Sequence, residues 1–151
     1  MNKIDLKKVA GYDEDLALWS AEQAALVRAG KLDRIDLANI AEEIESLGNS
    51  QESEIESRMT VLLCHLLKWQ YQPSQRSPSW QGTIIEQRSR IARVVRKSPS
   101  LKRHPGQVVD EEYVPARLHA AGETHLPVET FPKTCPYTIQ QILDPDFLPG
   151  D

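Results

Sequence analysis

One run of apolar side chains at helical spacing constrains this sequence more than any other feature. From Leu37 to Trp69, apolar or small residues recur every three or four positions, and the phase continues across Gly48. That period is one face of an α-helix. A break normally resets the phase, so we predict one helix over residues 34–71, about 50 Å long at 1.5 Å per residue. Two helices joined at Gly48 are the alternative, because glycine costs about 1 kcal/mol relative to alanine. We call this stripe the seam; its members are Leu37, Ala41, Ile44, Gly48, Gln51, Ile55, Met59, Leu62, Leu66 and Trp69.

Start and stop signals predict two more helices. The first covers residues 12–30, with Asp13 as its N-cap and Gly30 in the left-handed conformation that ends a helix. The other covers residues 78–97, because a serine cap followed by proline is typical of a helix start.

Prolines limit helix formation in the last third of the chain. We predict a broken helix over residues 99–122, since Pro105 and Pro115 each remove a backbone donor. Residues 123–151 are predicted to be an extended, proline-rich segment with a short helix near 136–143. Phe131 and Phe147 flank that helix and are expected to anchor the segment.

These elements predict the all-α fold class. We expect a helical bundle around one long central helix, with the proline-rich C-terminal segment packed on it, as a single domain over residues 1–151. Apolar residues make up 40% of the chain, and no run approaches the roughly 20 residues of a membrane span. The alternation of Lys, Asp and Leu from Met1 to Tyr12 is unlike a secretory signal, which favours the cytoplasm.

Charge is distributed unevenly along the chain. Residues 1–57 carry 13 acids and 6 bases, whereas residues 76–103 carry 8 bases and 1 acid. The basic block can face the acidic half of its own chain or bind an external polyanion, and the first interpretation is favoured.

Six polar residues are candidates for a buried cluster on the second and third helices. Glu42 and Glu45 share one helix face, and Arg58 can pair with Glu54 one turn earlier. A network with arginines of the third helix is favoured for the glutamates, over metal binding or simple exposure. The cluster is expected to fix helix register, with an anion site as the alternative. The six candidates are Glu42, Glu45, Arg58, His65, Gln87 and Arg88.

No metal site or cofactor is predicted. Glu45 and His65 are 20 residues apart, or about 30 Å in a straight helix, too far to share a metal ion. His65 is expected to be a hydrogen-bonded core residue. Cys64 is expected to be a small buried hydrophobe, and Cys135 precedes a short helix that can stabilise a thiolate. A nucleophilic pair of Cys135 with His119 or His125 is a weaker alternative.

The segment from residue 88 to 103 is a candidate nucleic-acid surface. Its basic side chains at helical spacing can follow a phosphate backbone, but no helix-turn-helix signature accompanies them. The residues concerned are Arg90, Arg93, Arg96 and Lys97.

Several stretches of the sequence resemble a known family. They are Tyr12-Asp13-Glu14-Asp15, Asn39–Leu47, His65–Pro73, Ser98-Pro99-Ser100-Leu101 and Cys135-Pro136-Tyr137. Together they resemble the bacterial domain-of-unknown-function family twenty-nine over nearly the whole chain. The resemblance implies a small all-helical protein and no particular activity, substrate or catalytic residue.

Three functions remain open at this point. The leading hypothesis is a non-enzymatic helical protein-interaction module that forms a homodimer or binds another protein, because one end of so long a helix can pack against a partner helix. The second is a small hydrolase or nuclease that uses Glu42 or Glu45 with a histidine from another helix or subunit. The third is nucleic-acid binding through residues 88–103.

Overall fold

The computed structural model describes residues 10–150. Within this range all regular structure is helical and there is no β-strand, so the predicted all-α fold around one long helix is confirmed. The α-helices are α1 (Leu16–Arg28), α2 (Leu37–Tyr71), α3 (Pro78–Lys97), α4 (His104–Thr124) and α5 (Ile139–Leu143). Short 3-10 turns lie at Leu32–Arg34, Pro73–Gln75, Pro99–Leu101 and Val128–Thr130.

The chain divides into two compact units, residues 1–49 and residues 50–151. Helix α2 is continuous across Gly48, as the unbroken phase of the seam predicts. A single domain over residues 1–151 stays a prediction. The stretch from Met1 to residue 9, on which the secretory-signal argument depends, lies outside the described residues.

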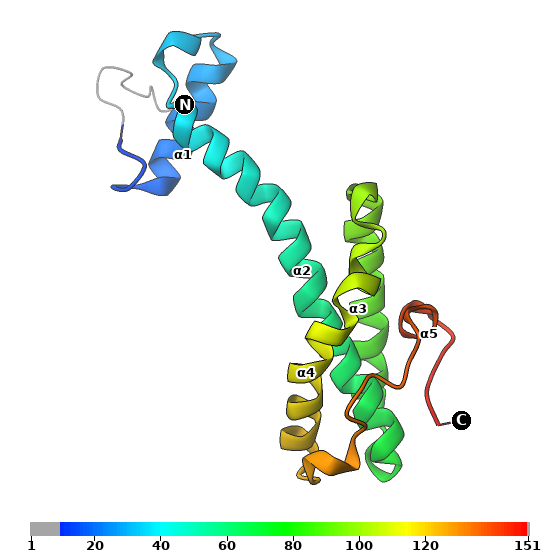
Figure 1. Cartoon of the computed structure of the whole chain (residues 1–151). Helices are drawn as coiled ribbons and strands as arrows, with labels where there is room; N and C mark the ends of the chain where they lie inside the picture. Colours follow the sequence, from blue (N-terminus) through cyan, green and yellow to red (C-terminus); the bar gives the residue numbers. More distant parts are fainter. Residues whose placement is uncertain (1–9, 151) are drawn as a thin grey trace. The chain divides into compact units, whose positions relative to one another are not determined.

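In the first unit, α1 lies beside the first turns of α2 (Figure 1). The cap of α1 is Asp15, which accepts a hydrogen bond from the Leu18 N–H. The prediction of Asp13 as the cap is wrong, because a hydrogen-bonded turn at residues 11–14 precedes the helix. Gly30 has a φ of +70° and ends the helical segment, as predicted.

A buried tryptophan holds the first unit together. Trp19 donates from Nε1 to the Asp36 carboxylate at 3.0 Å, and its ring meets the Tyr12 ring edge-on at 4.9 Å between centroids. The neighbouring side chain of Gln23 accepts from the Asp36 N–H at 2.7 Å. One loop aspartate therefore connects the chain before α2 to two successive turns of α1.

The second unit contains the main hydrophobic core. Helices α3 and α4 flank the C-terminal half of α2 (Figure 1), and this half of α2 is buried on nearly every side. The core side chains of α2 are Ile55, Met59, Leu62, Leu63, Cys64, Leu66, Leu67 and Trp69.

The seam is buried in its second half only. Its members from Ile55 onward have almost no exposed surface, whereas Leu37 and Ile44 in the first unit are largely exposed. The bundle expected around the long helix therefore covers the seam from Ile55 onward, whereas Leu37 and Ile44 in its first half are left open.

Helix α4 differs from the predicted broken helix. It begins at His104, with Pro105 in the first turn, where a missing N–H costs nothing. Pro115 lies inside the helix without ending it, although an interior proline costs about 3 kcal/mol. Buried Tyr113 and Ala116 on either side of Pro115 show why the helix persists, because tertiary packing supplies most helical stability.

The C-terminal segment packs on the second unit. Its helix α5 is shorter than the predicted 136–143 and has a capping box between Thr138 and Gln141. Phe131 is fully buried and its backbone carbonyl accepts from Arg117 Nε at 3.1 Å. Phe147 packs against the core and meets the Tyr137 ring edge-on.

Candidate functional site

Two of the six polar candidates meet between α2 and α3. Arg58 donates from Nη1 to Gln87 Oε1 at 3.2 Å and from Nε to Glu54 Oε1 at 3.0 Å. The predicted ion pair of Arg58 with Glu54 is confirmed. Both partners are partly exposed, so the pair contributes about 1 kcal/mol at most. The hydrogen bond from Arg58 to Gln87 is the contact that joins α2 to α3.

Arg88 is buried and points toward the C-terminal segment rather than toward Arg58. Its Nε donates to the Ile142 carbonyl at 2.8 Å, and Nη2 donates to the Gln141 carbonyl at 3.3 Å. Burial lowers the pKa of the guanidinium, while the negative charge of Asp144 acts in the opposite direction. The group therefore holds the last turn of α5 onto α3.

Glu42 and Glu45 lie in the first unit and are exposed. Among residues 10–150 neither carboxylate forms a hydrogen bond or an ion pair, and Ser46 contacts only the backbone carbonyl of Glu42. Both therefore lie outside the buried cluster expected from the sequence, and their network with arginines of the third helix stays a prediction.

His65 borders a cavity of about 210 Å³ in the second unit. Its Nδ1 lies 2.8 Å from the Val61 carbonyl, which selects the tautomer with the proton on Nδ1 and leaves Nε2 as an acceptor. Cys64, His119 and Glu123 line the same cavity. His65 is hydrogen-bonded, as expected, but it is partly exposed at the cavity and does not belong to the core.

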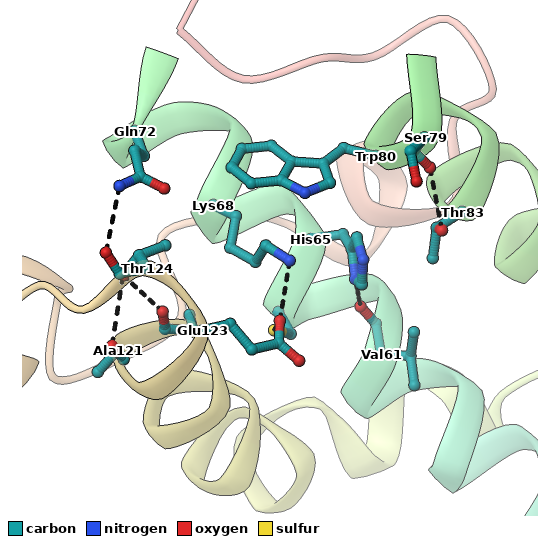
Figure 2. Close-up of polar contacts among 12 residues, drawn as sticks. Val61, His65, Lys68, Gln72, Ser79, Trp80, Thr83, Ala121, Glu123 and Thr124 are labelled. Carbon is teal, nitrogen blue, oxygen red and sulfur yellow. Dashed lines mark hydrogen bonds and ion pairs between the residues drawn. The ribbon is translucent and has the colours of Figure 1, made fainter. Parts of the chain in front are cut away.

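A lysine and a glutamate that the sequence analysis did not single out form the strongest ion pair near this cavity. Lys68, on α2, donates to the Glu123 carboxylate of α4 at 2.8 Å, and its Nζ lies 4.6 Å from the centre of the Trp80 ring (Figure 2). The Cys64 thiol also donates to Glu123, at 3.4 Å. The sequence did contain a signal for this pair: Lys68 lies in the apolar run Leu66-Leu67-Lys68-Trp69. A buried cation in such a run requires an acidic partner.

The protonation states around the cavity do not suit nucleophilic catalysis. Burial raises the pKa of the Cys64 thiol to about 12, so a thiolate is not available at neutral pH. Partial burial raises the pKa of Glu123, but the hydrogen bond and charge of Lys68 lower it by more, and the net pKa is below the usual value. The Glu123 carboxylate is therefore stabilised in its ionised form as the partner of the Lys68 ammonium.

Cys135 is not an activated thiol either. Its sulfur donates to the Tyr137 carbonyl at 3.6 Å, and burial raises its pKa. The expected stabilisation of a thiolate by the following helix is wrong, because burial dominates at this position. Neither His119 nor His125 forms a hydrogen bond with Cys135 among residues 10–150.

His65 makes the stability of the second unit depend on pH. Burial lowers its pKa, and the nearby Lys68 charge lowers it further, while the Val61 carbonyl and Glu123 act in the opposite direction. The folded pKa is below the unfolded value near 6.5, so the stabilisation is complete above that value and is lost as pH falls toward the folded pKa.

We therefore expect wild-type chain to lose stability below about pH 6.5, with a slope from this group of at most about 1.4 kcal/mol per pH unit. His65→Gln should show a shallower loss in urea titrations over the same pH range. Parallel curves for the two proteins would contradict the assignment.

The four basic candidates of α3 are all exposed. Arg90 forms an ion pair with Glu86 one turn earlier, at 3.1 Å. In the described part of the chain, Arg93, Arg96 and Lys97 have no such partner. Pairing of this block with the acidic half of the chain stays a prediction.

The first unit carries an open apolar groove between α1 and α2. Its volume is about 380 Å³. Ile44 and Leu47 on α2 are 63% and 68% exposed, and Val27 on α1 is nearly half exposed. We call it the α1–α2 groove; its apolar lining residues are Trp19, Ala24, Val27, Ile40, Ile44 and Leu47.

One wall of the α1–α2 groove is fixed by a hydrogen bond across the unit. The Tyr12 hydroxyl donates to the carboxylate of Glu43, which lines the groove. This bond raises the pKa of Tyr12, since the phenol donates to an anion. Sequence analysis missed the groove because periodicity predicts an apolar face without showing whether another element covers it.

Sequence comparison decides the family. Residues 11–148 match the family described as Domain of unknown function DUF29. The chain belongs to the DUF29 family. For this DUF29 protein, comparison with curated proteins and with solved structures finds no match.

The described residues of this DUF29 chain include neither a membrane-spanning helix nor a group of side chains that could bind a metal ion. Over residues 10–150 no helix has both the length and the apolar composition needed to cross a bilayer. Across the same range, no three side chains of the types that ligate metals are grouped so that they could hold an ion. A cytoplasmic location stays a prediction.

Proposed function

We propose that this DUF29 protein is a non-enzymatic helical interaction module, and that its α1–α2 groove binds a second copy of the same chain. The observation that carries the proposal is the open groove itself. Three large apolar side chains, Val27, Ile44 and Leu47, lie uncovered along one surface. Clustered exposed apolar residues are typical of protein-binding surfaces, and grooves of this kind bind amphipathic helices.

Charge supports a second copy as the occupant. Residues 10–49 carry nine acids and three bases, which favours a basic partner over an identical acidic surface. Residues 88–103 carry seven bases and no acid. One type of chain therefore supplies both an acidic N-terminal segment and a basic helical segment, and the groove lining itself carries one acid, Glu43, and one base, Arg28.

A hydrolase or nuclease based on Glu42 or Glu45 has less support. Both carboxylates are exposed and neither has an imidazole partner among the described residues. His104, the histidine that does contact a carboxylate, pairs with Glu56 instead, at 3.0 Å.

Replacing Ile44 by serine should weaken self-association at least about tenfold, because burying one large apolar side chain contributes about 1.5–3 kcal/mol. The measurement is molar mass by light scattering over a concentration series. Leu118→Ser is the matched control, since Leu118 on α4 is similarly exposed and does not line the groove. Equal weakening by both substitutions, or by neither, would count against the groove as the docking surface.

A further inference from the structure

Arg88 is a buried cation whose guanidinium is only partly used by its own chain. Its Nε and Nη2 donate to the carbonyls of Ile142 and Gln141, so one edge of the planar group holds α5 beside α3 (Figure 1). Among residues 10–150, Nη1 forms no hydrogen bond, and no carboxylate forms an ion pair with Arg88. The end of the fork, made by Nη1 and Nη2, therefore retains N–H groups without an acceptor.

One acid acts on Arg88 without contacting it. The negative charge of Asp144 influences the guanidinium, but Asp144 Oδ1 accepts a hydrogen bond from the Asp146 N–H at 2.9 Å. In the part of the chain that the structure describes, the two charged groups form no ion pair. A buried charge is stabilised by a counter-ion in direct contact with it, and Arg88 has no such partner of its own.

A small cavity, which we call the Arg88 pocket, borders this guanidinium. Its volume is about 300 Å³, and all of its lining belongs to the second unit. Only 6% of Arg88 is exposed, yet Nη1 is not one of the fully buried donors that lack a partner, so it keeps access to solvent. The lining combines this cation with one hydroxyl and four apolar side chains: Arg88, Ser89, Ile85, Ala92, Leu143 and Pro145.

We propose that the Arg88 pocket binds a small monocarboxylate with an apolar tail. The carboxylate accepts from the end of the Arg88 fork, because a guanidinium matches the two oxygens of a carboxylate. The tail covers the apolar walls made by Ile85, Ala92 and Leu143. A cavity of this volume is at the lower end of the range for ligand pockets, which favours a small molecule. This inference goes beyond the proposed function and does not involve the α1–α2 groove.

Hexanoate is a suitable probe, and its binding can be followed in wild-type chain by two-dimensional NMR of the backbone amides. We expect saturable shifts at α3 and α5 with a dissociation constant of about 1 mM or tighter. 1-Hexanol keeps the tail and lacks the charge, so it should bind at least about tenfold more weakly. Acetate keeps the charge and lacks the tail, and it should also bind at least about tenfold more weakly.

Filling the pocket tests the location of the site. Ala92→Phe should weaken hexanoate binding at least about tenfold, because the new ring occupies the space of the tail. Gln81→Phe is the matched control, since Gln81 is also exposed on α3 and does not line the pocket. Circular dichroism should show that both variants fold. Arg88→Met is a less direct test, because it also removes the donors that hold α5.

Asp144→Asn tests the position of the ligand charge. Asparagine keeps a side-chain oxygen for the Asp146 N–H and removes a negative charge near Arg88. We expect hexanoate to bind about two- to fivefold more tightly, because like charges repel. The affinity for 1-hexanol should stay the same. Weaker hexanoate binding in this variant would contradict a carboxylate on Arg88.

Three other results would overturn the inference. One is the absence of saturable shifts up to about 10 mM hexanoate. Another is equal affinity for hexanoate and 1-hexanol, which would leave the guanidinium without a role. The third is equal binding by Ala92→Phe and Gln81→Phe, which would place hexanoate elsewhere on the chain. Ile44→Ser should bind hexanoate like wild type, so failure of the groove proposal and failure of this inference are distinguishable.

Discussion

Leu66→Ala is expected to destabilise the chain by about 2–5 kcal/mol. Leu66 has no exposed surface and belongs to the seam in the buried half of α2. The loss combines the transfer free energy of three carbon atoms with the cost of a cavity that the surrounding helices cannot close. Urea denaturation followed by circular dichroism measures the change.

Leu47→Ala is the matched control for this prediction. It makes the same substitution in the same helix, but Leu47 is mostly exposed. At concentrations where the chain is monomeric, we expect a change within about 0.5 kcal/mol. A loss at Leu47 as large as the loss at Leu66 would mean that Leu47 is packed as tightly as Leu66, and no open groove would remain at that position.

Arg88→Met is expected to cost about 2–4 kcal/mol and to loosen the C-terminal segment. The guanidinium is buried, with 6% of the residue exposed, and supplies donors to the carbonyls of Gln141 and Ile142. A hydrogen bond from a charged donor contributes about 1.5–3 kcal/mol, and its removal leaves buried acceptors unpaired. Trypsin cleavage after exposed Lys133 should become faster, because residues beyond it are released from α3.

The comparison for Arg88 is Arg90→Met on the exposed side of α3. Within residues 10–150, Arg90 forms an ion pair with Glu86 one turn away and with no other residue, and such surface pairs contribute about 0.3–0.5 kcal/mol. Its cleavage rate at Lys133 should match that of wild type. If the two substitutions gave the same stability and the same cleavage pattern, Arg88 would not be what holds α5.

Local signals in the sequence predict which segments form helices. They predict the residues at which those helices begin and end less accurately. The phase of the seam predicts α2 across Gly48, and Ser77 with Pro78 predicts the start of α3. Pro115 was misjudged, because the packing that keeps it inside α4 comes from residues distant in sequence. The free-energy cost of an interior proline can be inferred from the sequence, but the tertiary packing that offsets this cost cannot.

The candidate site was predicted less completely than the fold. The pair of Arg58 with Glu54 follows from i,i+4 spacing on one helix. The partners of Lys68 and Arg88 lie 55 and 54 positions away, so no local rule could find them. The groove was hidden for a different reason: apolar periodicity does not distinguish a covered face from an open one.

This DUF29 chain is proposed to self-associate through its α1–α2 groove. Sedimentation equilibrium of the wild-type protein from about 1 to about 100 µM tests it most directly. We expect the average mass to rise from the 17.1 kDa of one chain toward twice that value, and we expect Ile44→Ser to shift this rise to higher protein concentration. A mass that stays at 17.1 kDa throughout would contradict the claim.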